Sequence, residues 1–178
     1  NSTYVENISF NQLRCDTSIA ELAIEVEFFS DSKQKYHICV EEETKNIREE
    51  FEISAIEGNN NFFEIIKIIK PDLWWPSGHG KQYLYNFKIK IHSIDFNDVY
   101  EKRIGIRDVL IKRDKDKDGE SFAISVNGKP IYSKGANWIP ADSFTTRLKR
   151  EDYKSLLGDA VKANMNTLRV WGGGIYEP

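Results

Sequence analysis

The stretch YLYNFKIKI, residues 83–91, carries the clearest structural signal in the chain. Its odd-numbered positions are aromatic residues or isoleucines, and the positions between them include Asn86, Lys88 and Lys90. An alternation of period two is typical of a β-strand with one face in a core and the other in water. The pattern predicts a half-buried strand over Tyr83–Ile91.

Two stretches upstream repeat this period and a third departs from it. Leu22–Phe29 and Tyr36–Val40 each place their apolar residues on one face, whereas Phe62–Ile69 is apolar on both faces and favours a central strand. Turn-rich or charged segments separate the strands, and no helical period precedes about residue 147. Several short strands with regular turns predict a β-sandwich in a mainly β fold.

The pattern changes near residue 112. Residues 112–120 hold four basic and four acidic side chains, which indicates a solvated loop between two units. An apolar strand face follows, and it ends at Asn127-Gly128. Because both of these residues tolerate positive φ, the dipeptide predicts a tight type I′ hairpin.

The last part of the chain predicts a strand, a helix and a second strand over Lys134–Trp138, Glu151–Ala163 and Thr167–Trp171. The helical segment carries one apolar stripe with helical spacing, beginning at Tyr153. Two strands joined by a helix form a βαβ unit, which is the repeat of a parallel sheet or barrel.

Composition excludes several classes of function. The 178 residues carry 25 Lys and Arg against 28 Asp and Glu, and this near balance argues against a nucleic-acid partner. No apolar run reaches the roughly 20 residues of a membrane span. The first ten residues show no signal peptide, so we assign no localisation; a periplasmic, secreted or lysosomal parent fits equally.

Few residues in the chain are suited to metals or cofactors. Cys15 and Cys39 stand outside any CxxC motif, and the three histidines show no ligand spacing, so we expect free or buried thiols and no metal site. The glycine run Gly172–Gly174 lacks the last glycine of a dinucleotide fingerprint. We therefore expect no cofactor.

The four tryptophans raise the question of carbohydrate binding, because indole rings stack on sugars. Trp74 and Trp75 fit better as a cover over one end of the sandwich core. Trp171 fits better as a functional residue, since it follows a barrel-type strand at the end where barrel active sites gather.

Three segments carry a family resemblance. VNGKPIYSKGANWIPADSF, residues 126–144, and ANMNTLRVWGGGIYEP, residues 163–178, closely resemble the family-2 glycoside hydrolase β-mannosidases. LWWPSGHGKQYLYNFKIKI, residues 73–91, resembles a strand of the immunoglobulin-like domain that precedes the barrel in that family. The resemblance implies an immunoglobulin-like β-sandwich over residues 1–111 and an incomplete βαβ start of a (β/α)₈ barrel over 112–178.

The resemblance also implies an activity for a larger parent protein. The β-mannosidases of this family are retaining exo-enzymes that remove terminal β-linked mannose. Their two catalytic carboxylates are glutamates on later barrel strands. The acid/base glutamate follows an asparagine, and the chain contains no Asn-Glu pair. Glu177 matches a different family position. We therefore expect no catalytic residue in this chain and no activity from it alone.

The resemblance assigns substrate-pocket positions to five residues. Trp171 would stack on the sugar and Arg169 would organise neighbouring carboxylates. Asn137, Trp138 and Asp142 match the segment at and after the first barrel strand, with roles left open. For Asn137 and Asp142, capping of a loop by side-chain hydrogen bonds is an equally weighted alternative.

The expected partner is a mannoside or mannose-containing glycan, bound by the full-length enzyme. The incomplete barrel piece leaves a sheet edge and apolar surface uncovered, so we also expect it to self-associate or to be poorly ordered. Two alternative functions remain: a non-catalytic carbohydrate-binding or interaction module, and a sister β-galactosidase or β-glucuronidase activity. The RVWGGG segment argues against the sister activities.

Overall fold

The computed structural model describes residues 2–174 and divides into two compact units. The first comprises the chain up to Trp74 together with Tyr83–Asp108. The second comprises Trp75–Gln82 and the chain from Val109 onward. The short segment Trp75–Gln82 thus leaves the first unit before the chain returns to it.

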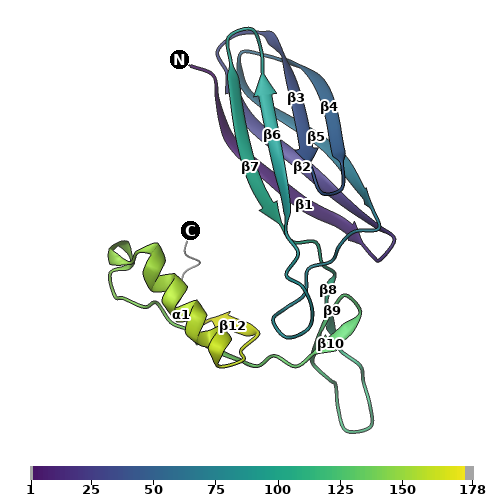
Figure 1. Ribbon diagram of the computed structural model, residues 1–178, viewed down its shortest axis with the longest axis vertical. Coiled ribbons are helices and arrows are strands. Elements are labelled where there is room, and N and C mark those ends of the chain that lie inside the picture. Colours follow the sequence, from purple (N-terminus) through teal and green to yellow (C-terminus); the bar gives the residue numbers. More distant parts are fainter. Residues whose placement is uncertain (1, 175–178) are drawn as a thin grey trace. The chain divides into compact units, whose positions relative to one another are not determined.

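The first unit is a β-sandwich of seven strands (Figure 1). In chain order these are β1 (Tyr4–Cys15), β2 (Ile19–Ser30), β3 (Gln34–Glu42), β4 (Ile47–Ala55), β5 (Gly58–Ile69), β6 (Tyr85–His92) and β7 (Asn97–Ile104). One sheet has the order β1-β2-β5 and the other β4-β3-β6-β7, and all pairings are antiparallel. The mainly β prediction is confirmed.

The predicted alternation builds the core between the two sheets. Strand β2 buries Leu22, Ile24, Val26 and Phe28, and β6 buries its apolar residues from Tyr85 to Ile91 completely. Rings meet across the sheets, with Phe28 and Tyr36 at 5.1 Å in an edge-to-face contact. Such pairs add to the burial of their apolar area. Strand β6 begins two residues later than predicted, at Tyr85.

The prediction of a central strand over Phe62–Ile69 is wrong. Among the described strands, β5 pairs only with β2, and it therefore forms an edge of its sheet. Its inward residues Phe62, Ile66 and Ile68 are buried, while Phe63 and Ile65 stand exposed on the other face. Hydrophobicity on both faces therefore marks an uncovered apolar surface here and not a second neighbouring strand.

The second unit contains a three-stranded antiparallel sheet of β8 (Val109–Lys112), β9 (Ala123–Val126) and β10 (Lys129–Ile131). Asn127 and Gly128 have φ values of 51° and 78° and join β9 to β10, as the hairpin prediction requires. The charged segment between β8 and β9 is exposed throughout.

The βαβ unit follows in the same part of the chain. It comprises β11 (Gly135–Trp138), the 3-10 helix η1 (Thr145–Arg147), α1 (Arg150–Lys162) and β12 (Thr167–Val170). Strands β11 and β12 pair in parallel, which confirms the predicted strand, helix, strand order. No residue of α1 is buried, although its apolar stripe is present.

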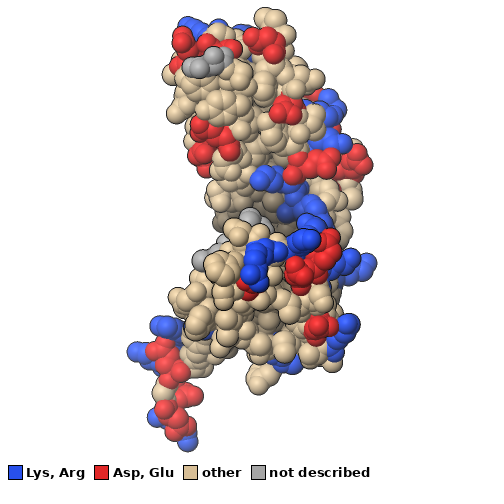
Figure 2. Space-filling model, turned by 90° about the vertical axis from the view of Figure 1, so that its left-hand side faces the viewer, with Lys and Arg blue, Asp and Glu red and all other residues tan. Residues whose placement is uncertain are grey.

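The described surface carries side chains of both charges beside exposed apolar side chains such as Phe63 and Val161. Acidic and basic side chains are interspersed on the face shown in Figure 2. Among the described helices, none has the length and apolar character that a membrane crossing demands. The two cysteines are free thiols, with Cys39 buried and Cys15 partly buried, in agreement with prediction.

Candidate functional site

The parallel register of β11 and β12 brings predicted pocket residues side by side. Asn137 lies opposite Arg169, and Trp138 lies opposite Val170. The Arg169 guanidinium donates a hydrogen bond of 3.1 Å to Asn137 Oδ1, and the Trp171 amide donates one of 3.2 Å to the Trp138 carbonyl. Four of the five predicted residues therefore gather at one end of the strand pair.

Asn166 fixes the opposite end of the same strand pair. Its Oδ1 accepts a hydrogen bond of 2.9 Å from the Lys134 amide, and its Nδ2 donates one of 3.0 Å to the Tyr132 carbonyl. Its own amide donates to the Lys134 carbonyl at 2.8 Å. One side chain thus joins the starts of two strands about 30 residues apart and holds their register.

Gly135 makes the close approach of these strands achievable. A Cβ atom at this position would overlap the Thr167 carbonyl oxygen. No side chain fits there, because real Cβ atoms essentially never approach within 3.0 Å of another heavy atom. The glycine in the KGANW segment is therefore a requirement of strand pairing.

A hollow of about 560 Å³ opens beside the end of β11. Its lining includes Asn137 and Trp138 from β11 and Asp152 and Leu156 from α1. The Trp138 ring stacks on the Tyr153 ring, with centroids 6.4 Å apart and planes at 23°. The hollow combines an amide, a carboxylate and an indole ring, which are groups that bind hydroxyl-rich ligands.

Trp171 lies beside the glycine run at the end of β12. Its side chain is 43 % exposed, and added Cβ atoms at Gly173 and Gly174 would both lie 2.9 Å from ring atoms. Small residues after the strand therefore leave room for the indole. Trp171 and Arg169 do not line the 560 Å³ hollow. Glu177 lies outside the described residues.

Asp142 does not join the other four residues. Its Oδ1 accepts a hydrogen bond of 2.8 Å from the Phe144 amide, and its Oδ2 forms an ion pair of 2.7 Å with Arg147. These are the bonds that the loop-capping alternative predicts for Asp142. The Asn137 side chain instead bonds across the strand pair to Arg169.

Trp74 and Trp75 belong to different units, so the prediction of a shared cover over the sandwich is wrong for Trp75. The Trp74 amide donates to the Ile106 carbonyl at 2.8 Å, and Arg107 lies over its ring at 5.0 Å. Trp75 packs against Gly80, and Lys129 lies over its ring at 5.2 Å. Both indoles are half-buried and engaged by protein groups.

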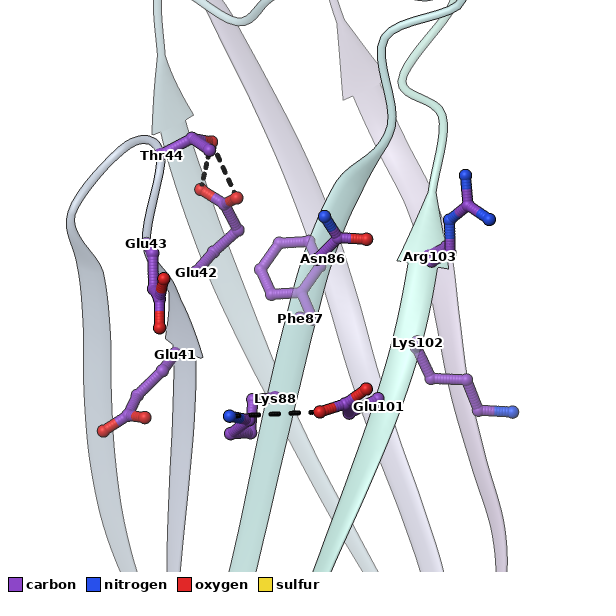
Figure 3. Close-up of a pocket in the computed structure, with 10 residues that line it drawn as sticks. All are labelled: Glu41, Glu42, Glu43, Thr44, Asn86, Phe87, Lys88, Glu101, Lys102 and Arg103. Atoms are coloured by element: carbon purple, nitrogen blue, oxygen red, sulfur yellow. Dashed lines mark hydrogen bonds and ion pairs between the residues drawn. The ribbon is translucent and has the colours of Figure 1, made fainter.

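A second hollow, of about 460 Å³, lies on the sandwich and is drawn in Figure 3. Its lining comprises Glu41, Glu42, Glu43, Thr44, Asn86, Phe87, Lys88, Glu101, Lys102 and Arg103. Glu42 accepts hydrogen bonds of 2.7 and 2.8 Å from Thr44, and Lys88 lies 3.9 Å from Glu101. The Phe87 side chain is fully buried, so this hollow offers no exposed ring for stacking on a sugar.

Sequence reasoning missed Tyr153 and Asn166 as parts of this region. The sequence pattern places Tyr153 only on the apolar stripe of the helix, and it assigns no role to Asn166. The signal for Asn166 was present, since an asparagine between a helix and a strand is suited to bonding nearby backbone groups. Nothing in the local sequence indicates that Tyr153 meets Trp138.

The model of the family described as glycosyl hydrolases family 2 matches residues 3–107. The chain belongs to this family. A β-mannosidase of Bos taurus is 44 % identical over 120 residues, which are 65 % of this chain and 14 % of that protein. A β-mannosidase of Rattus norvegicus is 46 % identical over 118 residues, covering 64 % of this chain and 13 % of that one. The chain thus spans about a seventh of the length of these two relatives.

Solved structures agree with the family assignment. The crystal structure of a β-D-mannosidase from Dictyoglomus thermophilum matches with a TM-score of 0.91 and 34 % identity, over 100 % of this chain and 22 % of that one. A β-glucuronidase from Parabacteroides merdae matches with a TM-score of 0.72 at 16 % identity, over 95 % of this chain and 21 % of that one. At that identity the second match shows a shared fold alone.

Proposed function

We propose that the chain is part of a retaining exo-β-mannosidase that removes terminal β-linked mannose from glycans. The observation that carries the proposal is the parallel pairing of β11 with β12, which gathers Asn137, Trp138, Arg169 and Trp171 at one end. The β-mannosidases among the relatives support this substrate over the galactoside and glucuronide alternatives.

In this proposal, residues 1–111 form the immunoglobulin-like domain and residues 112–178 begin a (β/α)₈ catalytic barrel. Strands of such a barrel present their carboxyl ends to the substrate. Trp171 then offers its exposed ring to the sugar, and Arg169 with Asn137 offers N–H donors to hydroxyls or to neighbouring carboxylates. Trp138, backed by Tyr153, forms a second wall.

The chain by itself is proposed to be inactive. Retaining hydrolysis needs two carboxylates roughly 5–5.5 Å apart, one as acid/base and one as nucleophile. The 178 residues contain no Asn-Glu pair, and in this proposal both glutamates lie on later barrel strands. Asp142 is already bound to Arg147 and to the Phe144 amide, which leaves it poorly suited to proton transfer.

The proposal is tested with an aryl β-mannoside and matched β-galactoside and β-glucuronide substrates on the full-length protein. We expect turnover of the mannoside alone, and at least a tenfold loss of kcat/KM in Trp171→Ala. Tyr132→Ala, which removes an 81 % exposed ring in the same unit, is the matched control and should retain full activity. Preferred turnover of another glycoside overturns the proposal.

Assays on the isolated chain distinguish part of an enzyme from a carbohydrate-binding module. We expect neither turnover nor saturable binding of manno-oligosaccharides by the 178 residues. Binding that is lost in Trp74→Ala or Trp75→Ala but kept in Trp171→Ala would assign the activity to a carbohydrate-binding module. Turnover above a denatured control would contradict the proposed absence of the catalytic pair.

Self-association through residues 112–178 is part of the same proposal. In the described chain, β11 and β12 form a sheet of two strands, and α1 leaves Leu156, Leu157 and Val161 between 41 % and 60 % exposed. Open strand edges and apolar stripes are surfaces that pair with other chains. Sedimentation should show a concentration-dependent dimer that weakens in Leu157→Lys; a strict monomer at all concentrations contradicts it.

A further inference from the structure

Two of the three histidines meet on the outer face of the sandwich, although they are 55 positions apart in the sequence. His37 of β3 lies directly opposite His92 of β6 in the antiparallel register. Their rings stack with centroids 5.1 Å apart and planes at 18°, and both side chains are exposed. The third histidine, His79, lies in a turn of the other unit.

A carboxylate extends this pair to a third strand. Glu52 of β4 lies opposite His37, and its Oε2 is 3.7 Å from His37 Nε2. The three side chains form a row across β6, β3 and β4, beside a hollow of about 380 Å³ that they help to line. Cys39, two residues along β3, lines the same hollow.

We propose that His37 and His92 bind one divalent transition-metal ion, Cu²⁺, Ni²⁺ or Zn²⁺, with Glu52 as an additional oxygen ligand and water completing the coordination. Imidazole nitrogen is a preferred ligand of these three metals. In the described part of the chain no three His, Cys, Asp or Glu side chains are already arranged around one point. The exposed rings must therefore turn about their side-chain torsions to converge.

The charges that face the pair compensate one another. Lys35 lies 2.6 Å from Glu52 and Lys90 lies 2.7 Å from Glu41, while Arg48 pairs with both Glu41 and Glu50. On the side of β7, His92 faces the neutral Asn97. The site thus carries no large net positive charge to repel a cation.

Two further features set the strength of the site. Lys35 donates a hydrogen bond of 2.6 Å to Glu52 Oε1, whereas the other carboxylate oxygen, Oε2, lies 3.7 Å from His37 Nε2. Lys35 also competes with the metal for Glu52. Protons compete with a metal for the imidazole nitrogens, so binding should be weaker at pH 5.5 than at pH 7.5.

The test is calorimetric titration of the untagged 178-residue chain with Ni²⁺ or Zn²⁺ at pH 7.5 and pH 5.5, alongside four variants. We expect one ion per chain, at least tenfold weaker binding in His37→Ala and in His92→Ala, and a smaller loss in Glu52→Gln. His79→Ala is the matched control and should bind as the original chain does. Circular dichroism of each variant verifies that the sandwich is folded.

Cu²⁺ provides a second readout that locates the ion. Paramagnetic broadening of amide resonances should be strongest around His37 on β3 and His92 on β6. It should be absent in the variant that combines His37→Ala with His92→Ala. Equal affinity in His37→Ala, His92→Ala and the original chain, or loss of binding in His79→Ala, overturns the site. This inference stands independently of the proposed glycosidase function.

Discussion

The two units of the chain bury their apolar residues to very different degrees. In the sandwich, Tyr36, Tyr85, Phe87 and Ile89 have no exposed surface, and both sheets contribute to one core. In the βαβ unit, α1 has no buried residue. The sandwich therefore completes its core from its own strands, whereas the described residues leave the apolar stripe of α1 without a comparable cover.

Removing one side chain from each unit should have very different effects on stability. Phe87→Ala takes a fully buried ring from the middle of β6, stacked on Phe10 at 4.8 Å, and should destabilise the sandwich by about 3–5 kcal/mol. Leu157→Ala on α1, where the side chain is 47 % exposed, should change the free energy of unfolding by less than about 0.5 kcal/mol. Urea denaturation measures both; similar losses would show that the units do not differ.

Two glycines of the βαβ unit differ in the space around them. Gly135→Ala forces a Cβ against the Thr167 carbonyl and should cost about 1–3 kcal/mol, so amide exchange in β12 should accelerate. Gly158→Ala is the matched control, because nothing lies within 4 Å of its added Cβ. It should favour α1 by about 1 kcal/mol and slow exchange there. Faster exchange in both variants would contradict the assigned role of Gly135.

The smallest expected effect depends on pH and lies in the sandwich. Asp16 accepts hydrogen bonds from the Ser18 hydroxyl, from the Ser18 and Ile19 amides and from Arg14. These bonds, led by that of the Ser18 hydroxyl, hold the pKa of Asp16 well below its usual range. A lowered folded-state pKa contributes stability that is present above the unfolded value near 3.9 and disappears as pH falls through the folded value.

Asp16→Asn should therefore lower the urea midpoint at pH 6 by more than it does at pH 2.5. Glu57→Gln, at an exposed position of another turn, is the control and should leave the midpoint unchanged at both pH values. A deficit in Asp16→Asn that is the same at both pH values would show that the ionised carboxylate contributes nothing to the turn between β1 and β2.

Strands with one regularly buried face could be predicted from the sequence, and other strands could not. The alternation in β2, β3 and β6 matched the observed burial closely. Strands β1 and β7 were not predicted individually, because both lie at sheet edges and expose most of their residues. The error at β5 has the same origin, since periodicity records which faces are apolar but not how many neighbours a strand has.

The parts of the candidate site that depend on local sequence pattern or on the family resemblance could be predicted, and the contacts between distant elements could not. Strand, helix and strand were placed correctly, and the positions of Asn137 and Arg169 followed from the parallel register. The stacking of Trp138 on Tyr153 and the meeting of His37 with His92 depend on which strands and helices become neighbours. Contacts of that kind are set by topology, which no short window of sequence contains.

Asn166 has a consequence for how this part of the chain can change over evolution. Its side chain holds the register of β11 and β12 at their starts, away from the end that carries Asn137 and Arg169. We therefore expect a change of loop length between Ile139 and Lys149 to leave the register of the two strands unchanged. The Asn166 side chain thus keeps the pairing of β11 with β12 independent of the loop that follows β11.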